Sequence, residues 1–194
     1  TTDSVGHGTQ MSLVASGVVD PIGAGNDGLR NNSIVAVRAF DENGFTSNAT
    51  LMRSIDYAIR ADAKIVSMSW GSEDQSPMLE QVVNYATGNG LIMVAAAGNT
   101  PTGRPVYPAA YTSVIGVGAL MPDGSVWDQS NYGEFVSVYA PGVASMPVGH
   151  NGDSGTYAGT SISTAYIAHR IAQVLAETPD ADIETIISKL NSSN

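Results

Sequence analysis

The chain has 194 residues, 43% of them apolar and 13% charged, which is the composition of a globular protein. Eight basic and eighteen acidic residues give a formal net charge of −10, which argues against a nucleic-acid partner because phosphates require a lysine and arginine surface. The absence of cysteine excludes disulfides, thiolate zinc sites and a cysteine nucleophile. There is no membrane-length apolar run, no repeat and no linker, so we expect one domain over residues 1–194.

Strand-like runs and helix-like stretches alternate in the first half of the chain. Residues 33–40 and 64–69 are short β-branched runs that predict strands, and residues 50–60 between them carry apolar side chains at helical spacing. A second helix is predicted over residues 76–88, where a serine suits the N-cap and a proline follows at the first helical position.

The second half continues the alternation. Residues 91–96 and 114–120 are almost continuously apolar, as expected for parallel strands covered on both faces, and residues 135–140 predict another strand. Helices are predicted over residues 161–176 and 180–190. The pattern indicates an α/β fold: a doubly wound, mostly parallel sheet with helices on both faces, and functional residues at the carboxyl ends of its strands.

Three short segments contain residues suited to acyl transfer. His7 lies in Gly-His-Gly-Thr, Asn99 ends the run Ala-Ala-Ala-Gly-Asn after a buried strand, and Ser161 opens a predicted helix. This chemistry needs a nucleophilic hydroxyl, an imidazole to accept its proton and N–H groups aimed at the oxyanion. A serine at a helix N-terminus has free N–H groups beside it, and an asparagine can add one more. Each segment alone also fits a structural reading, as a turn or an N-cap.

Six segments, taken in order, resemble the subtilase family of serine proteases over nearly the whole chain. Their joint occurrence is far more specific than any one of them. The segments are residues 6–9 (GHGT), 67–71 (SMSWG), 95–99 (AAAGN), 107–119 (YPAAYTSVIGVGA), 130–142 (SNYG running into APG) and 159–161 (GTS).

The resemblance implies a serine endopeptidase with three catalytic residues. His7 is implied to be the general base, Ser161 the nucleophile that forms an acyl-enzyme, and Asn99 the side chain of the oxyanion hole. It implies no required cofactor, peptide or protein substrates, and secretion or attachment to the cell envelope.

The resemblance also implies two substrate-binding segments. One forms a cleft wall that pairs with the substrate backbone as an added strand: Ser67, Met68, Ser69, Trp70 and Gly71. The other lines the pocket for the side chain before the scissile bond: Ala96, Ala97 and Gly98. These small apolar residues favour a large hydrophobic side chain there.

The triad aspartate is the main departure from the family pattern. In the family it lies on the first strand, well before the histidine, whereas only six residues precede His7. We expect it to come from an upstream segment or a separate N-terminal fragment that completes the sheet. Asp3 is the only nearby acidic residue, and we expect it in the loop before the helix. Ala165 stands where the family usually has proline.

Other interpretations remain open at this point. The chain could be an inactive fragment or a pseudoprotease that binds peptides without cleaving them. Ser154 lies in Gly-Asp-Ser-Gly, which resembles the nucleophile loop of chymotrypsin-like proteases, but those are all-β proteins. His150 and His169 are expected to be structural. The oxygen-rich residues 20–32 could hold calcium, although their spacing fits no defined loop and we assign no metal ligands.

Overall fold

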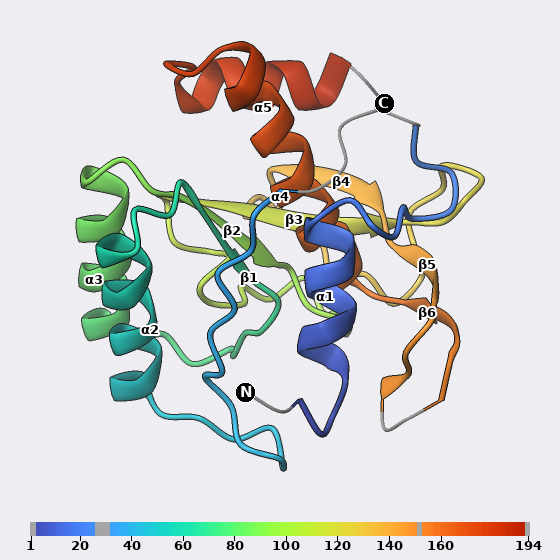
Figure 1. Ribbon diagram of the computed structural model, residues 1–194, viewed down its shortest axis with the longest axis horizontal. Helices are drawn as coiled ribbons and strands as arrows, with labels where there is room; N and C mark the ends of the chain where they lie inside the picture. The colour runs from blue at the N-terminus through green and yellow to red at the C-terminus, as the bar shows by residue number, and fades with distance from the viewer. Residues whose placement is uncertain (1–2, 26–31, 151–152, 193–194) are drawn as a thin grey trace.

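A parallel four-stranded sheet forms the centre of the molecule in the computed structural model, which describes residues 3–25, 32–150 and 153–192 (Figure 1). Its strands lie in the order β1 (Ile65–Met68), β2 (Ile92–Ala96), β3 (Val114–Leu120) and β4 (Val138–Pro141). Every neighbouring pair is parallel, so all four carboxyl ends meet at one edge.

Helices cover both faces of this sheet. Helices α2 (Asn48–Arg60) and α3 (Pro77–Gly88) pack together on one face, and α1 (His7–Ala15) and α4 (Thr160–Glu177) pack together on the other (Figure 1). The last helix, α5 (Ile183–Ser192), contacts α4 and β4. A separate antiparallel hairpin joins β5 (Val143–Met146) to β6 (Gly155–Ala158).

Two hydrophobic cores lie on opposite faces of the sheet. Along β2, Ile92 and Val94 belong to the core beneath α1 and α4, while Met93 and Ala95 belong to the core beneath α2 and α3. Because successive strand side chains point to opposite faces, a continuous apolar run supplies both cores. The prediction of a doubly wound α/β sheet with helices on both faces is therefore confirmed.

The strand predicted over residues 33–40 is wrong. Among the described residues, 32–39 form neither a helix nor a paired strand, and Ile34, Val35 and Val37 are exposed. This stretch has the composition of a strand, but a strand needs a neighbouring strand for its backbone hydrogen bonds. None of the described strands, including the edge strand β1, pairs with it. Two smaller differences are that the predicted 135–140 strand begins only at Val138 and that the β5–β6 hairpin was not predicted.

The fold brings the candidate segments to one end of the molecule. The stretches containing Ser69 and Asn99 directly follow the carboxyl ends of β1 and β2, and α4 starts beside them. Helix α1 also starts on the side where the strands end (Figure 1). Residues from four distant parts of the sequence therefore converge at the edge where parallel α/β sheets bind ligands.

Candidate active site

Ser161 lies in the first turn of α4, two residues after the N-cap Gly159. Its hydroxyl is 3.5 Å from the carbonyl oxygen of Ser69, a loose contact, and the Ser69 hydroxyl donates to the Ser161 carbonyl at 3.2 Å. No described residue accepts a hydrogen bond from the Ser161 backbone N–H, as expected in a first helical turn. A loosely held hydroxyl and an available N–H group thus lie together at the positive end of the helix dipole.

Asn99 is fixed beside Ser161 by the neighbouring Thr160. Its amide oxygen accepts from the Thr160 backbone N–H at 2.9 Å and from the Thr160 hydroxyl at 2.8 Å. The Thr160 hydroxyl in turn accepts from the Gly98 N–H at 3.3 Å. Because two donors hold the oxygen, the amide orientation is determined, and no described residue accepts from the Asn99 nitrogen. That N–H group is available to a ligand.

His7 is the first residue of α1 and follows Gly6, whose φ of 88° is left-handed and suits glycine. Its side chain is half-buried, and no described residue forms a hydrogen bond with its ring. Burial lowers the pKa of His7 below its ordinary value of 6.5, and the nearby His150 lowers it further, while Asp3 opposes both effects. The imidazole is therefore neutral at neutral pH and able to accept a proton.

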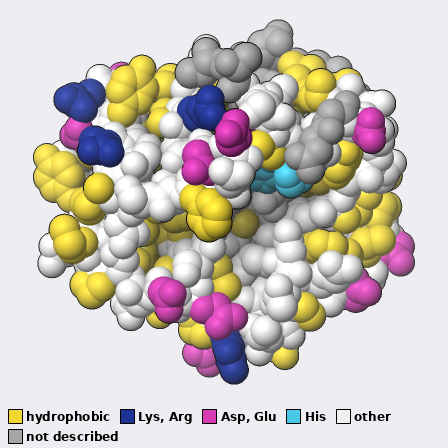
Figure 2. All heavy atoms as spheres, turned by 90° about the horizontal axis from the view of Figure 1, so that it is seen from below, with side chains coloured by type: hydrophobic (Ala, Val, Ile, Leu, Met, Phe, Trp, Pro, Cys, Tyr) yellow, Lys and Arg dark blue, Asp and Glu magenta, His cyan; other side chains and the backbone are white. Residues whose placement is uncertain are grey.

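His150 contacts His7 from the loop between β5 and β6, with the ring centroids 5.9 Å apart. No sequence motif indicates this contact, because His150 belongs to a loop whose path depends on the whole fold. Figure 2 looks onto this end of the molecule and shows histidine side chains beside a hollow. His169, by contrast, is buried in α4, where its ring nitrogens bond to Asn32 and Gln173 at 3.0 and 3.1 Å.

Asp3 uses both carboxylate oxygens to hold the start of α1. One oxygen accepts from the Gly6 N–H at 2.9 Å, and the other accepts from the Thr9 N–H and the Thr9 hydroxyl, both at 2.7 Å. The expectation that Asp3 lies in the loop before the helix is consistent with these bonds. No described carboxylate forms a hydrogen bond with His7.

The segment expected to form a cleft wall runs through the end of β1. Ser67 and Met68 are strand residues paired with β2, and Ser69 contacts Ser161. Trp70 packs on Phe40 with ring centroids 6.1 Å apart.

Gly71 lies in a close backbone contact. A Cβ at this position would lie 2.5 Å from a Val106 methyl carbon, so a larger residue would require Val106 to move. The next residue, Ser72, forms an antiparallel bridge to Tyr107. The segment therefore continues beyond the sheet and contacts residues 106–107.

Burial and hydrogen bonds hold in place the segment that is expected to line the specificity pocket. Ala96 and Ala97 are buried, and the Ala97 N–H donates to the Val117 carbonyl at 2.9 Å. Gly98 has a left-handed φ of 102°, and its carbonyl accepts from Asn131. The buried Asn131 amide also donates to the Ala97 carbonyl at 3.1 Å. These bonds fix the backbone that leads to Asn99.

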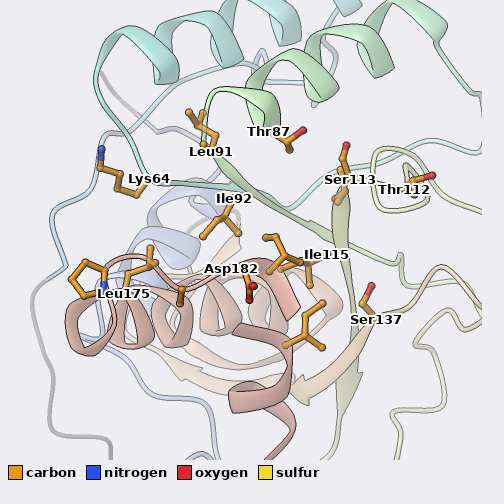
Figure 3. Close-up of a pocket in the computed structure, with 16 residues that line it drawn as sticks. Lys64, Thr87, Leu91, Ile92, Thr112, Ser113, Ile115, Ser137, Leu175 and Asp182 are labelled. Atoms are coloured by element: carbon orange, nitrogen blue, oxygen red, sulfur yellow. The ribbon is translucent and has the colours of Figure 1, made fainter. Parts of the chain in front are cut away.

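A large cavity lies elsewhere, at the opposite edge of the sheet. It has a volume of about 710 Å³ and is lined by strand starts, among them Lys64, Ile92 and Ile115, and by the α4–α5 region, including Leu175 and Asp182 (Figure 3). Its lining contains none of the candidate catalytic residues. The candidate active site is therefore defined by its candidate catalytic side chains and does not coincide with this cavity.

Within residues 3–25, 32–150 and 153–192, no group of three or more His, Cys, Asp or Glu side chains is placed to hold a metal ion. Residues 26–31, including Asp27 of the loop considered for calcium, lie outside the described residues. No described helix is long and apolar enough to cross a membrane.

The chain is similar in sequence to several bacterial proteases. The chain is 34% identical over 179 residues to the thermophilic serine proteinase of Bacillus sp. (strain AK1), covering 92% of this chain and 44% of that protein. It is 33% identical over 163 residues to thermitase of Thermoactinomyces vulgaris, covering 84% of this chain and 58% of thermitase. The chain thus spans about half the length of the curated relatives it matches.

The fold comparison agrees with the sequence comparison. The crystal structure of a cold-adapted subtilisin-like serine proteinase superposes with a TM-score of 0.78 at 26% identity, covering 98% of this chain and 68% of that one. A mutant of the PatA protease domain gives a TM-score of 0.70 at 26% identity, over 89% and 65% of the two chains. The family profile matches residues 1–193, and the chain belongs to the subtilase family.

Proposed function

We propose that residues 1–194 are one catalytic domain of a serine endopeptidase. Ser161 is the nucleophile, His7 is the general base and then the general acid, and Asn99 is the oxyanion-hole side chain. The observation that carries the proposal is the Thr160–Asn99 contact, which leaves the Asn99 amide nitrogen available next to the Ser161 N–H. Two donors beside a nucleophile are what a tetrahedral intermediate requires.

The reaction follows from these roles. The Ser161 oxygen attacks the peptide carbonyl while its proton passes to His7, and the carbonyl oxygen becomes an oxyanion held by Ser161 N–H and Asn99. The C–N bond then breaks, and the proton on His7 goes to the departing amine. A water molecule attacks the resulting ester and gives its proton to His7. The bond between the acyl carbon and the Ser161 oxygen then breaks, the Ser161 oxygen takes the proton back from His7, and the acid leaves. In this structure Ser161 and His7 are not hydrogen-bonded, and such contacts often tighten only when substrate binds.

We further propose that an upstream segment, or a separate N-terminal fragment, supplies the triad aspartate as an added strand. Two observations support this. Among the described strands β1 pairs only with β2, so its other edge is open to a further strand. Residues 32–39 belong to none of the described strands and expose Ile34, Val35 and Val37. An added strand would cover these apolar side chains and satisfy the β1 backbone.

The substrate-binding assignments belong to the same proposal. Ser67, Met68, Ser69, Trp70 and Gly71 form the wall that pairs with the substrate backbone, and Ala96, Ala97 and Gly98 line the pocket for a large hydrophobic side chain. The substrates are peptides or proteins, and no cofactor is required. Secretion or a place at the cell envelope is supported by one relative, the minor extracellular protease Epr of Bacillus subtilis, 35% identical over 179 residues.

A peptide-binding pseudoprotease is the second candidate. The observation that favours it is that no described carboxylate accepts a hydrogen bond from the His7 ring. In subtilisin itself, loss of the triad aspartate alone costs on the order of 10⁴-fold in turnover. A folded chain that never acquires an aspartate would keep the cleft and lose nearly all its turnover.

The two candidates are separated by labelling with a fluorophosphonate probe, followed by intact-mass analysis of every polypeptide in the purified sample. The protease proposal expects one adduct, located on Ser161, together with an upstream fragment of the same precursor. Ser161→Ala should abolish the adduct. Ser154→Ala is the matched control, because Ser154 is an exposed serine of the hairpin, and this variant should label like the unchanged chain.

A folded sample that contains this chain alone and gives no adduct would support the pseudoprotease. An adduct on Ser154 would contradict the assignment of the nucleophile. An adduct on Ser161 without any upstream fragment would support the nucleophile but overturn the added strand.

A further inference from the structure

The close approach of His7 and His150 brings two imidazole rings together at the candidate site. Their ring centroids are 5.9 Å apart and their planes are tilted by 47°. His7 is the first residue of α1, and His150 lies in the β5–β6 loop. The two rings therefore come together only in the folded protein.

This separation suits two ligands of one metal ion. A zinc ion lies about 2.0–2.1 Å from an imidazole nitrogen and therefore about 3.2 Å from the ring centroid. Two such ligands at the tetrahedral angle place their centroids about 5.2 Å apart. The observed 5.9 Å is slightly longer, and rotation of the two side chains can close this difference without movement of the backbone.

The loop that carries His150 is tied to α1. The Gln10 side-chain amide donates to the Val148 carbonyl at 2.9 Å, and Gln10 is almost fully buried. Gly6 packs so closely on Gly149 that a Cβ on Gly6 would overlap the Gly149 carbonyl oxygen. The His150 N–H also donates to the Tyr157 hydroxyl at 3.1 Å. The backbones of both histidines are therefore held in place before any ligand binds.

We propose that His7 and His150 together bind one divalent transition-metal ion, of which Zn²⁺ is the type. Imidazole is a ligand for zinc, copper and nickel, whereas calcium and magnesium take oxygen ligands. The described residues offer no third His, Asp or Glu for the same ion, so water completes its coordination and the site binds more weakly than a structural zinc site.

Metal binding has a consequence for catalysis, and this consequence rests on the proposed function. A His7 nitrogen that donates its lone pair to the metal cannot accept the proton of Ser161. The metal therefore acts as a reversible inhibitor, and its removal by a chelator restores the base.

Histidine acylation by diethyl pyrocarbonate, read by peptide mass spectrometry, tests the site without relying on hydrolysis. The protein is used untagged, at low micromolar concentration, with any fragment that co-purifies. Zn²⁺ should slow acylation of both His7 and His150, and Mg²⁺ should not. His169 is an internal reference, because its buried, hydrogen-bonded ring should react slowly with or without zinc.

The His150→Ala variant decides whether the two rings act together. His150 is exposed in a loop, so its removal should not disturb folding, which circular dichroism checks. The zinc concentration that half-protects His7 should rise about tenfold or more in this variant, because one of two ligands is lost. Equal protection of His7 in the variant, or no protection in the unchanged chain, overturns the proposal. Zinc protection without any fluorophosphonate adduct would uphold the metal site while the proposed function fails.

Discussion

Thr160 connects the two groups that we assign to the oxyanion hole. Its hydroxyl and its backbone N–H both donate to the Asn99 amide oxygen, and its side chain is 1% exposed. A buried threonine hydroxyl with two partners restricts the asparagine to one orientation. In the proposed function Thr160 is thereby a positioning residue, and Asn99 and Ser161 are the residues that would touch substrate.

Thr160→Val tests this positioning. The substitution keeps the side-chain shape and removes the hydroxyl, so Asn99 keeps one of its two donors. We expect the fluorophosphonate labelling rate of Ser161 to fall about tenfold, less than the 10²–10³ typical for loss of a whole oxyanion donor. The time course of adduct formation measures this rate.

Thr164→Val is the matched control for that substitution. Thr164 is also fully buried in α4, and its hydroxyl donates to the Thr160 carbonyl at 2.7 Å, one turn away from Asn99. It should lose stability, about 1 kcal/mol for one buried hydrogen bond, and keep its labelling rate. An equal fall in labelling for both variants would mean that Thr160 acts only through folding.

Some residues of the candidate site can be recognised from the sequence alone, and others cannot. His7, Asn99 and Ser161 lie in short segments whose glycines and flanking residues mark them, so they could be named before the fold was known. His150 could not, because only the path of the β5–β6 loop brings it to His7. No spacing along the chain encodes a contact between a helix start and a distant hairpin.

At the scale of one element, Asp3 organises the start of α1. Partial burial raises the pKa of Asp3, but hydrogen bonds from the Thr9 hydroxyl and from backbone N–H groups, including those of Gly6 and Thr9, outweigh it. The pKa of Asp3 therefore lies below its ordinary value of 3.8. The ionised carboxylate holds the turn that presents His7.

Asp3→Asn should make the protein less stable at neutral pH and less dependent on pH in acid. Since folding lowers the pKa of Asp3, its contribution is fully present above 3.8 and is lost as pH falls through the lower folded value. The difference in unfolding free energy between the two proteins should shrink over that window. Denaturant titrations at several pH values measure it, and a difference that stays constant down to the lowest pH would contradict the role.

Helices and strands are predicted correctly where the residues of the element itself determine its structure. They are predicted poorly where the structure depends on pairing with another strand. Helix α3 was predicted from Ser76 and Pro77, and in the structure Ser76 accepts from the Leu79 N–H as an N-cap. Residues 33–40 have β-branched composition, but a strand needs a partner, and none of the described strands lies beside them. The β5–β6 hairpin was missed because residues 155–158 are mostly small or exposed and carry little alternation.

At the scale of the molecule, β1 is an edge strand of the sheet. The four strands β1 to β4 share two cores with five helices, but no second described strand pairs with β1, and Ile65 and Val66 are only partly buried. Residues 32–39, which belong to none of the described strands, add exposed apolar side chains, with Val35 49% and Val37 42% exposed. An open strand edge and exposed β-branched residues are features that promote pairing with other chains.

Val35→Lys should therefore reduce self-association of the isolated chain. We expect the unchanged chain to form oligomers as its concentration rises, because strand edges and apolar side chains pair between copies. Light scattering coupled to size exclusion measures the effect. Val18→Lys is the control: Val18 is 55% exposed, lies outside residues 32–39 and changes the net charge equally, so it should leave association unchanged. A monodisperse, cooperatively melting isolated chain would mean that its sheet is complete without the proposed upstream strand.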